Sequence, residues 1–227
     1  MTAGIQIFNN SNIVQVDENY RNFLLVASGQ FTASIANINS NAWWLQFQYI
    51  WTKLTSQAIM AVRTTTYPGL NLNIGSYRDG LKVCNFSFRT DQPPIPFQFY
   101  IYDNVPANNS NLGMQVFNAS GQLVYDAQDY PLKVVTAIDS EFGGLTYNGA
   151  HANLAYASSG GGYWFDCDGS DTEEVRCYTH WSGNTLVPNF LENIRDAGGD
   201  PLGQYGRADQ SGIIVDVTNV PTTFTRS

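Results

Sequence analysis

One segment of the chain occurs twice, and both copies have the pattern of a β-hairpin. Residues 4–17 recur as residues 113–126, and six of the fourteen positions are identical, where ordinary residue frequencies would give about one. Apolar residues alternate with glutamine at the start of each copy, which is the period of a strand with one buried face. A polar turn follows, in which Asn12 of one copy matches Gly121 of the other. Both residue types readily adopt positive φ, so the repeat predicts the same tight hairpin used twice.

The polarity of the chain comes from uncharged residues, which favours strands over helices. Only 13% of the residues are charged, whereas 14% are aromatic. Asn, Gln, Ser and Thr mixed with Tyr and Trp suit sheet surfaces better than helices. We expect a mainly β protein, an antiparallel β-sandwich with a duplicated hairpin and little helix. Candidate strands cover residues 31–38, 42–52, 56–65, 81–89, 96–102 and 211–217.

The residue composition changes after about residue 140. Residues 1–140 are expected to form a β-sandwich region that contains both copies of the repeat. Residues 141–227 are rich in glycine and short polar stretches, which predicts a loop-rich region, either part of the same domain or separate from it. Within it, residues 188–197 are a candidate helix that Pro188 or Asn189 begins and Gly198 ends.

Charge and hydropathy exclude several function classes. A net charge of -8 and a pI near 4.5 disfavour nucleic-acid binding, because phosphate neutralisation needs clustered Lys and Arg. No run of about eighteen apolar residues is present, so no membrane span is expected. The chain starts Met-Thr-Ala-Gly without a basic and apolar leader. We therefore expect no signal peptide, and synthesis and folding in a cytoplasm.

The repeat resembles small proteins encoded among the tail genes of tailed bacteriophages. The resemblance is carried by Gly-[Ile/Met]-Gln-[Ile/Val]-Phe-Asn-x-Ser-[Asn/Gly], followed by Asp and then Tyr, at residues 1–26 and 113–135. It covers about the first 140 residues. It implies a structural protein of the virion, in the tail or tail tip, assembled in the host cytoplasm. Its partners would be neighbouring tail proteins or further copies of itself, as a homo-oligomer, and no catalytic residues carry over.

An aromatic cluster in the second half of the chain suggests an alternative function. Tyr163, Trp164, Tyr178 and Trp181 lie around an acidic turn. An exposed aromatic patch can stack on sugar rings or bury against another subunit. The alternative to a structural role is therefore a receptor-recognition module that binds a host-surface glycan.

Two cysteines in the same region are candidates for a disulfide. Cys167 and Cys177 flank a segment that a hairpin could fold back on itself, and closing so short a loop would stabilise the fold by roughly 2 to 3 kcal/mol. A chain folded in a cytoplasm keeps its thiols reduced. The sequence does not decide between a disulfide and two free thiols.

The acidic turn is a weak candidate for metal binding or catalysis. Asp166, Asp168 and Asp171 are the hard oxygen ligands that calcium uses, but the glycine comes too early for the helix-loop-helix calcium motif. The alternative interpretation is that the acidic residues simply form a turn that is exposed to solvent. A hydrolase needs a pair of carboxylates, yet nineteen acidic residues make some pair inevitable. We expect no enzyme activity and no cofactor.

Overall fold

The computed structural model describes most strands and the loops of one end of the molecule. The residues it describes are 6–8, 14–17, 22–33, 47–51, 55, 57–64, 71–78, 81–87, 95–110, 112–140, 147–148, 153–160, 163–167, 171–182, 185–196, 205–207 and 210–226. None of these residues is helical, and the strands are paired antiparallel. The prediction of a mainly β, antiparallel fold is confirmed.

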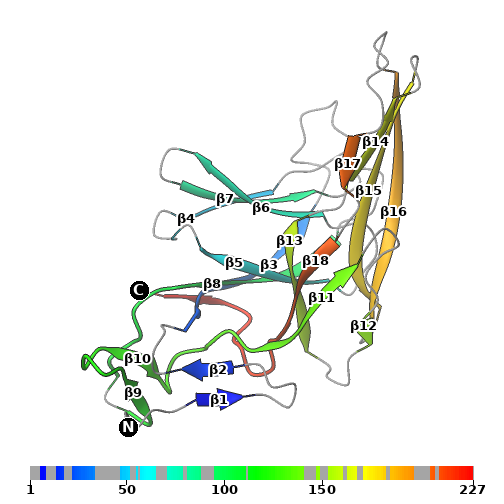
Figure 1. The fold of residues 1–227 in the computed structure, drawn as a ribbon. Helices are drawn as coiled ribbons and strands as arrows, with labels where there is room; N and C mark the ends of the chain where they lie inside the picture. The colour runs from blue at the N-terminus through cyan, green and yellow to red at the C-terminus, as the bar shows by residue number, and fades with distance from the viewer. Residues whose placement is uncertain are drawn as a thin grey trace.

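A seven-stranded sheet forms the centre of the fold (Figure 1). Strands from both sides of residue 140 combine in it, because β13 (Leu154–Gly160) pairs with β5 (Ile59–Thr64) and β19 (Phe224–Thr225) pairs with β3 (Leu24–Ala33). The central sheet thus connects the two regions that the sequence distinguishes. In spatial order its strands are β11 (Val134–Ser140), β18 (Gln210–Asp216), β13 (Leu154–Gly160), β5 (Ile59–Thr64), β8 (Ile95–Asp103), β3 (Leu24–Ala33) and β19 (Phe224–Thr225).

Two smaller sheets and two hairpins accompany the central sheet. A five-stranded sheet contains β12 (Tyr147–Asn148), β16 (Thr185–Asp196), β15 (Asp171–Ser182), β14 (Tyr163–Cys167) and β17 (Tyr205–Arg207), and a three-stranded sheet contains β4 (Phe47–Trp51), β7 (Leu81–Ser87) and β6 (Asn71–Arg78). The hairpins are β1 (Gln6–Phe8) with β2 (Val14–Asp17), and β9 (Gln115–Phe117) with β10 (Leu123–Asp126). Figure 1 shows both hairpins at the end of the molecule opposite the long β15–β16 ribbon.

Two predictions for the second half of the chain are wrong. Residues 188–196 of the candidate helix belong to strand β16, and the region expected to be loop-rich contains β12 to β19. The twelve residues of β16 pair with β15 along its whole length, and such long-range pairing overrides local helix signals. Pro188 is compatible with strand β16, because β12 pairs only with Leu186 and Thr185 of that strand. The other side of β16 therefore has no described partner beside Pro188, which is where a strand tolerates proline.

The strand predictions in the first half differ mainly at the boundaries. Strands β4, β5, β7 and β8 lie within or close to the expected ranges, and β18 lies near 211–217. Strand β3 begins at Leu24 rather than residue 31, and residues 34–38 lie outside the described residues. Strand β6 has no counterpart among the predictions.

The central sheet is buried on both faces. Leu25, Tyr100, Tyr102, Ala155 and Val215 belong to one buried cluster. The second cluster consists of Leu154, Tyr156, Ile214 and Leu186, the last of which comes from the five-stranded sheet. Because neighbouring residues of a strand point to opposite faces, the two clusters account for the continuous apolar runs of β13 and β18.

The two hairpins of the repeat have the same register. Gln6 pairs with Asp17 as Gln115 pairs with Asp126, and Phe8 pairs with Val14 as Phe117 pairs with Leu123. The register shifts at the same step in both, so Gln15 and Val124 are the extra residues of equivalent bulges. Gly121 has φ of 75°, as its place in the turn predicts, while Asn12 lies outside the described residues. Each hairpin then leads into a strand of the central sheet, β3 or β11.

Two strand glycines lie beneath aromatic rings. A Cβ at Gly212 would lie 2.6 Å from the Tyr156 ring and still closer to the Ala157 carbonyl oxygen, and one at Gly29 would lie 2.6 Å from the Phe99 ring. Such rings shield a strand where glycine leaves a gap. The close packing leaves no space for a side chain at either position.

We expect Gly212→Ala to destabilise the fold by about 2 kcal/mol or more, because the added methyl group displaces a backbone carbonyl and a buried ring. Gly121→Asn is the matched control: nothing lies within 4 Å of a Cβ at Gly121, and asparagine tolerates positive φ. Urea unfolding of both variants measures the difference. Equal stability of the two variants would contradict the packing described for Gly212.

Candidate functional site

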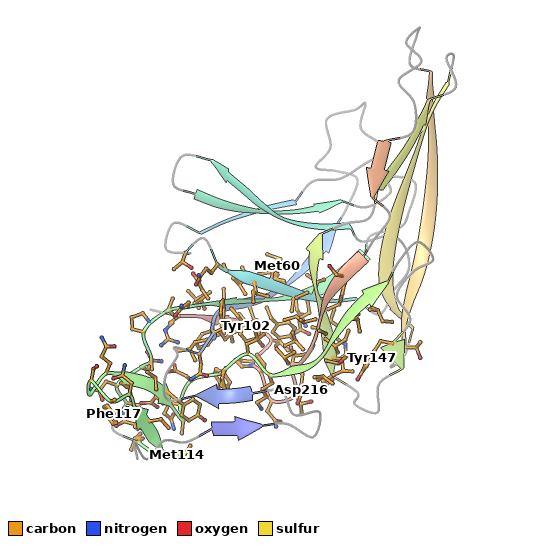
Figure 2. The ribbon with its side chains drawn as sticks, in the orientation of Figure 1. Met60, Tyr102, Met114, Phe117, Tyr147 and Asp216 are labelled. Atoms are coloured by element: carbon orange, nitrogen blue, oxygen red, sulfur yellow. The ribbon has the colours of Figure 1, made fainter. Side chains whose placement is uncertain are left out.

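Three large hydrophobic side chains are exposed at and beside the second hairpin. Leu112, Met114 and Phe117 have 63%, 44% and 51% of their surface exposed, and they are the exposed large hydrophobic residues of the described part. Figure 2 shows Met114 and Phe117 at the outer end of the molecule, away from Met60 and Tyr102 in the core. We call Leu112, Met114 and Phe117 the apolar patch. Met114 and Phe117 are three residues apart along the hairpin, so alternation assigns them to opposite faces, and exposed apolar side chains of this kind are candidates for contact with a partner.

The apolar patch lies in a stretch without charge. Residues 104–125 contain no Asp, Glu, Lys or Arg. The aspartates that border this stretch, Asp103 and Asp126, are buried, as is Asp129 just beyond it. The exposed neighbours of the patch are small or carry amides, such as Asn109, Ala119 and Gln122. Depletion of charge around exposed aromatic and methionine side chains is typical of the core of a protein interface.

The buried carboxylate of Asp126 is hydrogen-bonded to the segment that precedes the apolar patch. Its carboxylate accepts hydrogen bonds from the Ser110 amide at 2.9 Å, the Gln115 side-chain amide at 2.9 Å and the Gln128 amide at 2.8 Å. The Ser110 hydroxyl lies 2.8 Å from both carboxylate oxygens. A buried charge is tolerated when it is hydrogen-bonded in this way. Asp126 therefore fixes Ser110, next but one to Leu112, onto the hairpin.

These hydrogen bonds determine the ionisation of Asp126. Burial alone raises the pKa of the carboxyl, but the bonds from Gln115, Gln128 and Ser110 favour the charged form and together hold the pKa below its usual range. The carboxylate is consequently charged at neutral pH and in mild acid. In the first hairpin Gln6 and Asp17 are paired in the same register.

Asp129 and Arg226 join the loop of residues 104–110 to the end of the chain, just after β19. The Arg226 guanidinium contacts the Asp129 carboxylate at 2.9 Å and donates to the Pro106 carbonyl at 2.8 Å. Asn108 donates to Asp129 from both its backbone amide, at 2.9 Å, and its side chain, at 2.8 Å. The Arg226 amide in turn donates to the Val26 carbonyl of β3. The loop is thus tied to the central sheet through one ion pair.

Asp103 secures the start of the same loop. Its buried carboxylate accepts hydrogen bonds from the amide and hydroxyl of Thr55 and from the Asn104 amide. Three buried carboxylates, those of Asp103, Asp129 and Asp126, therefore receive the amides of Asn104, Asn108 and Ser110. These hydrogen bonds fix the backbone of residues 104–110, which has no regular secondary structure.

The remaining contacts fix the hairpin itself. The Asn118 side-chain oxygen accepts the Ser120 and Gln122 amides within the turn. Asn22 donates to the carbonyl of Val124 at the bulge. The chain after the hairpin then pairs with the start of β3, because Leu25 donates to Tyr130 and Leu132 donates to Phe23. The apolar patch is presented by a backbone that is held on both sides, which reduces the entropic cost of binding.

The four aromatic residues suggested by the sequence belong to the five-stranded sheet. Tyr163 pairs with Arg176 and Trp164 with Val175, whereas Trp181 pairs with Leu186. Tyr178 pairs with Asn189 in the same sheet. The aromatic site stays a prediction.

The two cysteines are far apart along the same hairpin. Cys167 pairs with Thr172 and Cys177 pairs with Phe190. Cys177 lies five residues beyond Thr172 in β15, which corresponds to about 16 Å along a strand. A disulfide needs Cα atoms within about 7 Å. This register does not bring Cys167 and Cys177 together.

The acidic residues lie near the β14–β15 turn. Asp166 pairs with Glu173 and Asp171 with Asp196, while Asp168 lies outside the described residues. Among the residues described, no group of three or more His, Cys, Asp or Glu is placed to hold a metal ion. The metal site stays a prediction.

The residues that build the apolar patch were not predicted from the sequence. The alternation of Met114 and Val116 with Gln115 predicts a buried face for Met114, whereas Met114 is exposed. The one available signal was the uncharged stretch 104–125. Asp126 was visible as an identity of the repeat, and its pairing with the equally repeated Gln115 gives that identity a physical reason.

Comparison of the chain with family models, curated proteins and solved structures gives no match. No described segment has the length and hydropathy of a membrane-spanning helix. Because fold alone does not define function, the geometry of the patch and its anchors carries the functional argument.

We expect Asp126→Asn to lower the free energy of unfolding by about 2 kcal/mol at neutral pH, because an amide cannot accept from all the donors that face the carboxylate. Urea unfolding measures the loss. Asp216→Asn is the control, since Asp216 accepts the Thr218 amide and its loss should be smaller. An Asp126→Asn variant as stable as the Asp216→Asn variant would contradict the anchoring role.

The same variant has a predictable pH dependence. The pKa of Asp126 is lower in the folded than in the unfolded protein, so its contribution is complete above the unfolded-state pKa, near 4, and is lost as pH falls toward the folded value. The stability difference between wild type and Asp126→Asn should stay constant from about pH 7 to pH 5 and shrink below about pH 4. A difference that shrinks above pH 5 would contradict the low pKa.

We expect Arg226→Gln to destabilise the fold by about 1 to 3 kcal/mol, because the Asp129 carboxylate stays buried without its cation. Arg226→Lys should recover part of the loss, since an ammonium restores the charge but not the guanidinium geometry. Thermal unfolding compares the variants. An unchanged melting temperature in Arg226→Gln would show that the ion pair is not needed.

Proposed function

We propose that the chain is a non-catalytic structural protein of a tailed-phage virion, in the tail or tail tip, and that the apolar patch docks a neighbouring protein. The exposure of Leu112, Met114 and Phe117 on an anchored backbone is the observation that carries this proposal. A surface held in its binding conformation suits permanent assembly, because little order has to be created on binding.

Two further observations support an assembly role. The chain resembles phage tail proteins through the repeat, and the second copy of that repeat supplies Met114 and Phe117 of the patch. The buried aspartates in turn use their oxygens to fix backbone amides. These carboxylates act as structural anchors, which is a different role from the acid and base pair of a hydrolase.

The position of the patch also separates this proposal from glycan binding. A glycan site would use Tyr163, Trp164, Tyr178 and Trp181, which belong to the five-stranded sheet. The patch has one aromatic ring, Phe117, beside two aliphatic side chains. Aliphatic surface of this kind favours a protein partner over a sugar.

Mass spectrometry of purified particles of a phage that encodes this chain tests the proposal. We expect its peptides in the particle, and we expect Phe117→Ser to reduce the incorporated amount at equal expression, because the patch loses its largest side chain. Ala137→Ser is the control, since Ala137 is exposed on β11 of the central sheet. Absence of the wild-type chain from the particle would contradict the proposal.

Glycan binding is measured in the same experiment series. Purified protein is applied to a glycan array together with Trp164→Ala and Trp181→Ala. Sugar binding that these variants lose, in a chain missing from particles, would replace the structural proposal by receptor recognition.

A further inference from the structure

The outer edge of β3 is completed by two short segments that come from different parts of the chain. After the second hairpin, residues 130–132 pair with the start of β3. Next to them, residues 224–226 pair with residues 26–28 of the same strand. We call residues 224–226 the C-terminal clasp. Figure 1 shows the C-terminus beside the chain that leads from β8 to the second hairpin.

Two contacts join the C-terminal clasp to the segment that follows the second hairpin. The Phe224 ring meets the Tyr130 ring edge-on, with centroids 5.7 Å apart and an angle of 78° between the ring planes. The Arg226 guanidinium contacts the Asp129 carboxylate at 2.9 Å, and the Asp129 side chain is completely buried. The clasp therefore supplies both a packing partner for Tyr130 and the counter-charge of a buried carboxylate.

Asp129 also connects the C-terminal clasp to the loop that follows β8. Its carboxylate accepts the Asn108 amide at 2.9 Å and the Asn108 side chain at 2.8 Å. Arg226 in addition donates to the Pro106 carbonyl at 2.8 Å. Arg226 and Asn108 thus satisfy the same buried charge together. Departure of either residue would leave that charge incompletely compensated, which is costly.

The C-terminal clasp can open without unfolding of the central sheet. Strand β19 within it is only two residues long. The Ser28 hydroxyl donates to the Pro221 carbonyl at 2.6 Å, which fixes the chain before the clasp. Thr222 and Thr223, which connect Pro221 to the clasp, are exposed. Short pairing at a sheet edge belongs to the least stable part of a fold, where local opening takes place.

We propose that the C-terminal clasp and residues 106–108 of the loop open and close as one unit. Once Arg226 leaves, Asp129 regains full hydration only if Asn108 also moves away, because both residues cover the same carboxylate. Opening of one segment consequently favours opening of the other. The clasp is then a conformational device that controls the order of the loop leading to Leu112. The device goes beyond the proposed function, since the coupling exists whatever this end of the molecule binds.

Residue-resolved amide hydrogen exchange of the wild type and Phe224→Ala tests the coupling. The substitution removes the ring of the clasp and leaves Asp129 and its donors unchanged. We expect the Arg226 and Asn108 amides to exchange tenfold faster or more, by the same factor within about twofold. The Ser120 amide in the hairpin turn, which donates to a side chain of the turn itself, is expected to keep its rate. An Asn108 amide that stays at the wild-type rate while Arg226 accelerates would overturn the proposal, as would equal acceleration of Ser120.

Urea dependence provides a readout in the wild-type protein, which holds even if a variant does not fold. Exchange of the Asn108 and Arg226 amides should increase with urea at the same slope, and this slope should be smaller than that of the β8 amides in the centre of the sheet. The reason is that opening of one unit exposes less surface than global unfolding. Different slopes for the two amides, or a slope equal to that of β8, would overturn the proposal.

A charge-matched pair of variants tests the role of the ion pair. Arg226→Gln and Arg63→Gln each remove one guanidinium, and Arg63 donates to Asn153 at 2.6 Å in another part of the fold. Only Arg226→Gln should accelerate exchange of the Asn108 amide, tenfold or more, because it alone removes a partner of Asp129. The same acceleration in both variants would show a general loss of stability and would overturn the coupling through Asp129.

Discussion

The arrangement of the outer end of the molecule depends on the burial of three carboxylates. Asp103, Asp126 and Asp129 are removed from water, and a buried charge is stable only where hydrogen bonds replace its hydration. The donors that do so are the amides of one irregular loop, with Arg226 as the counter-charge of Asp129. Movement of the loop would leave these charges unsatisfied, which favours a single conformation of the loop. The exposed Leu112 lies just beyond this loop.

The repeat explains how this end is attached to the remainder of the fold. Both hairpins have the same register and bulge, and each leads into a strand of the central sheet. The cross-strand pair of Gln115 and Asp126 accounts for two of the identical residues of the repeat. These features support a duplicated unit. Because the central sheet takes strands from both halves of the chain, the hairpins are attached to a common core.

The sequence predicted what local chemistry determines and missed what distant contacts determine. Alternation and turn residues are local, so the β class, the second hairpin and the positive φ of Gly121 were predictable. Residues 188–196 have helix-like signals at their ends, and their pairing with β15 is what makes them a strand. The burial of Asp126 depends on Ser110 and Gln128 arriving beside it, which no short pattern indicates. The exposure of Leu112 and Met114 is likewise not indicated by any short pattern.

The central claim is that buried carboxylates hold the loop that presents the apolar patch. Residue-resolved amide hydrogen exchange of the wild-type protein tests it most directly, because the amides of Asn104, Asn108, Ser110 and Gln128 donate to these carboxylates. The account predicts that these four amides exchange slowly, with protection approaching that of sheet amides such as Leu25. Exchange of the four at the rate of an unstructured chain would contradict it.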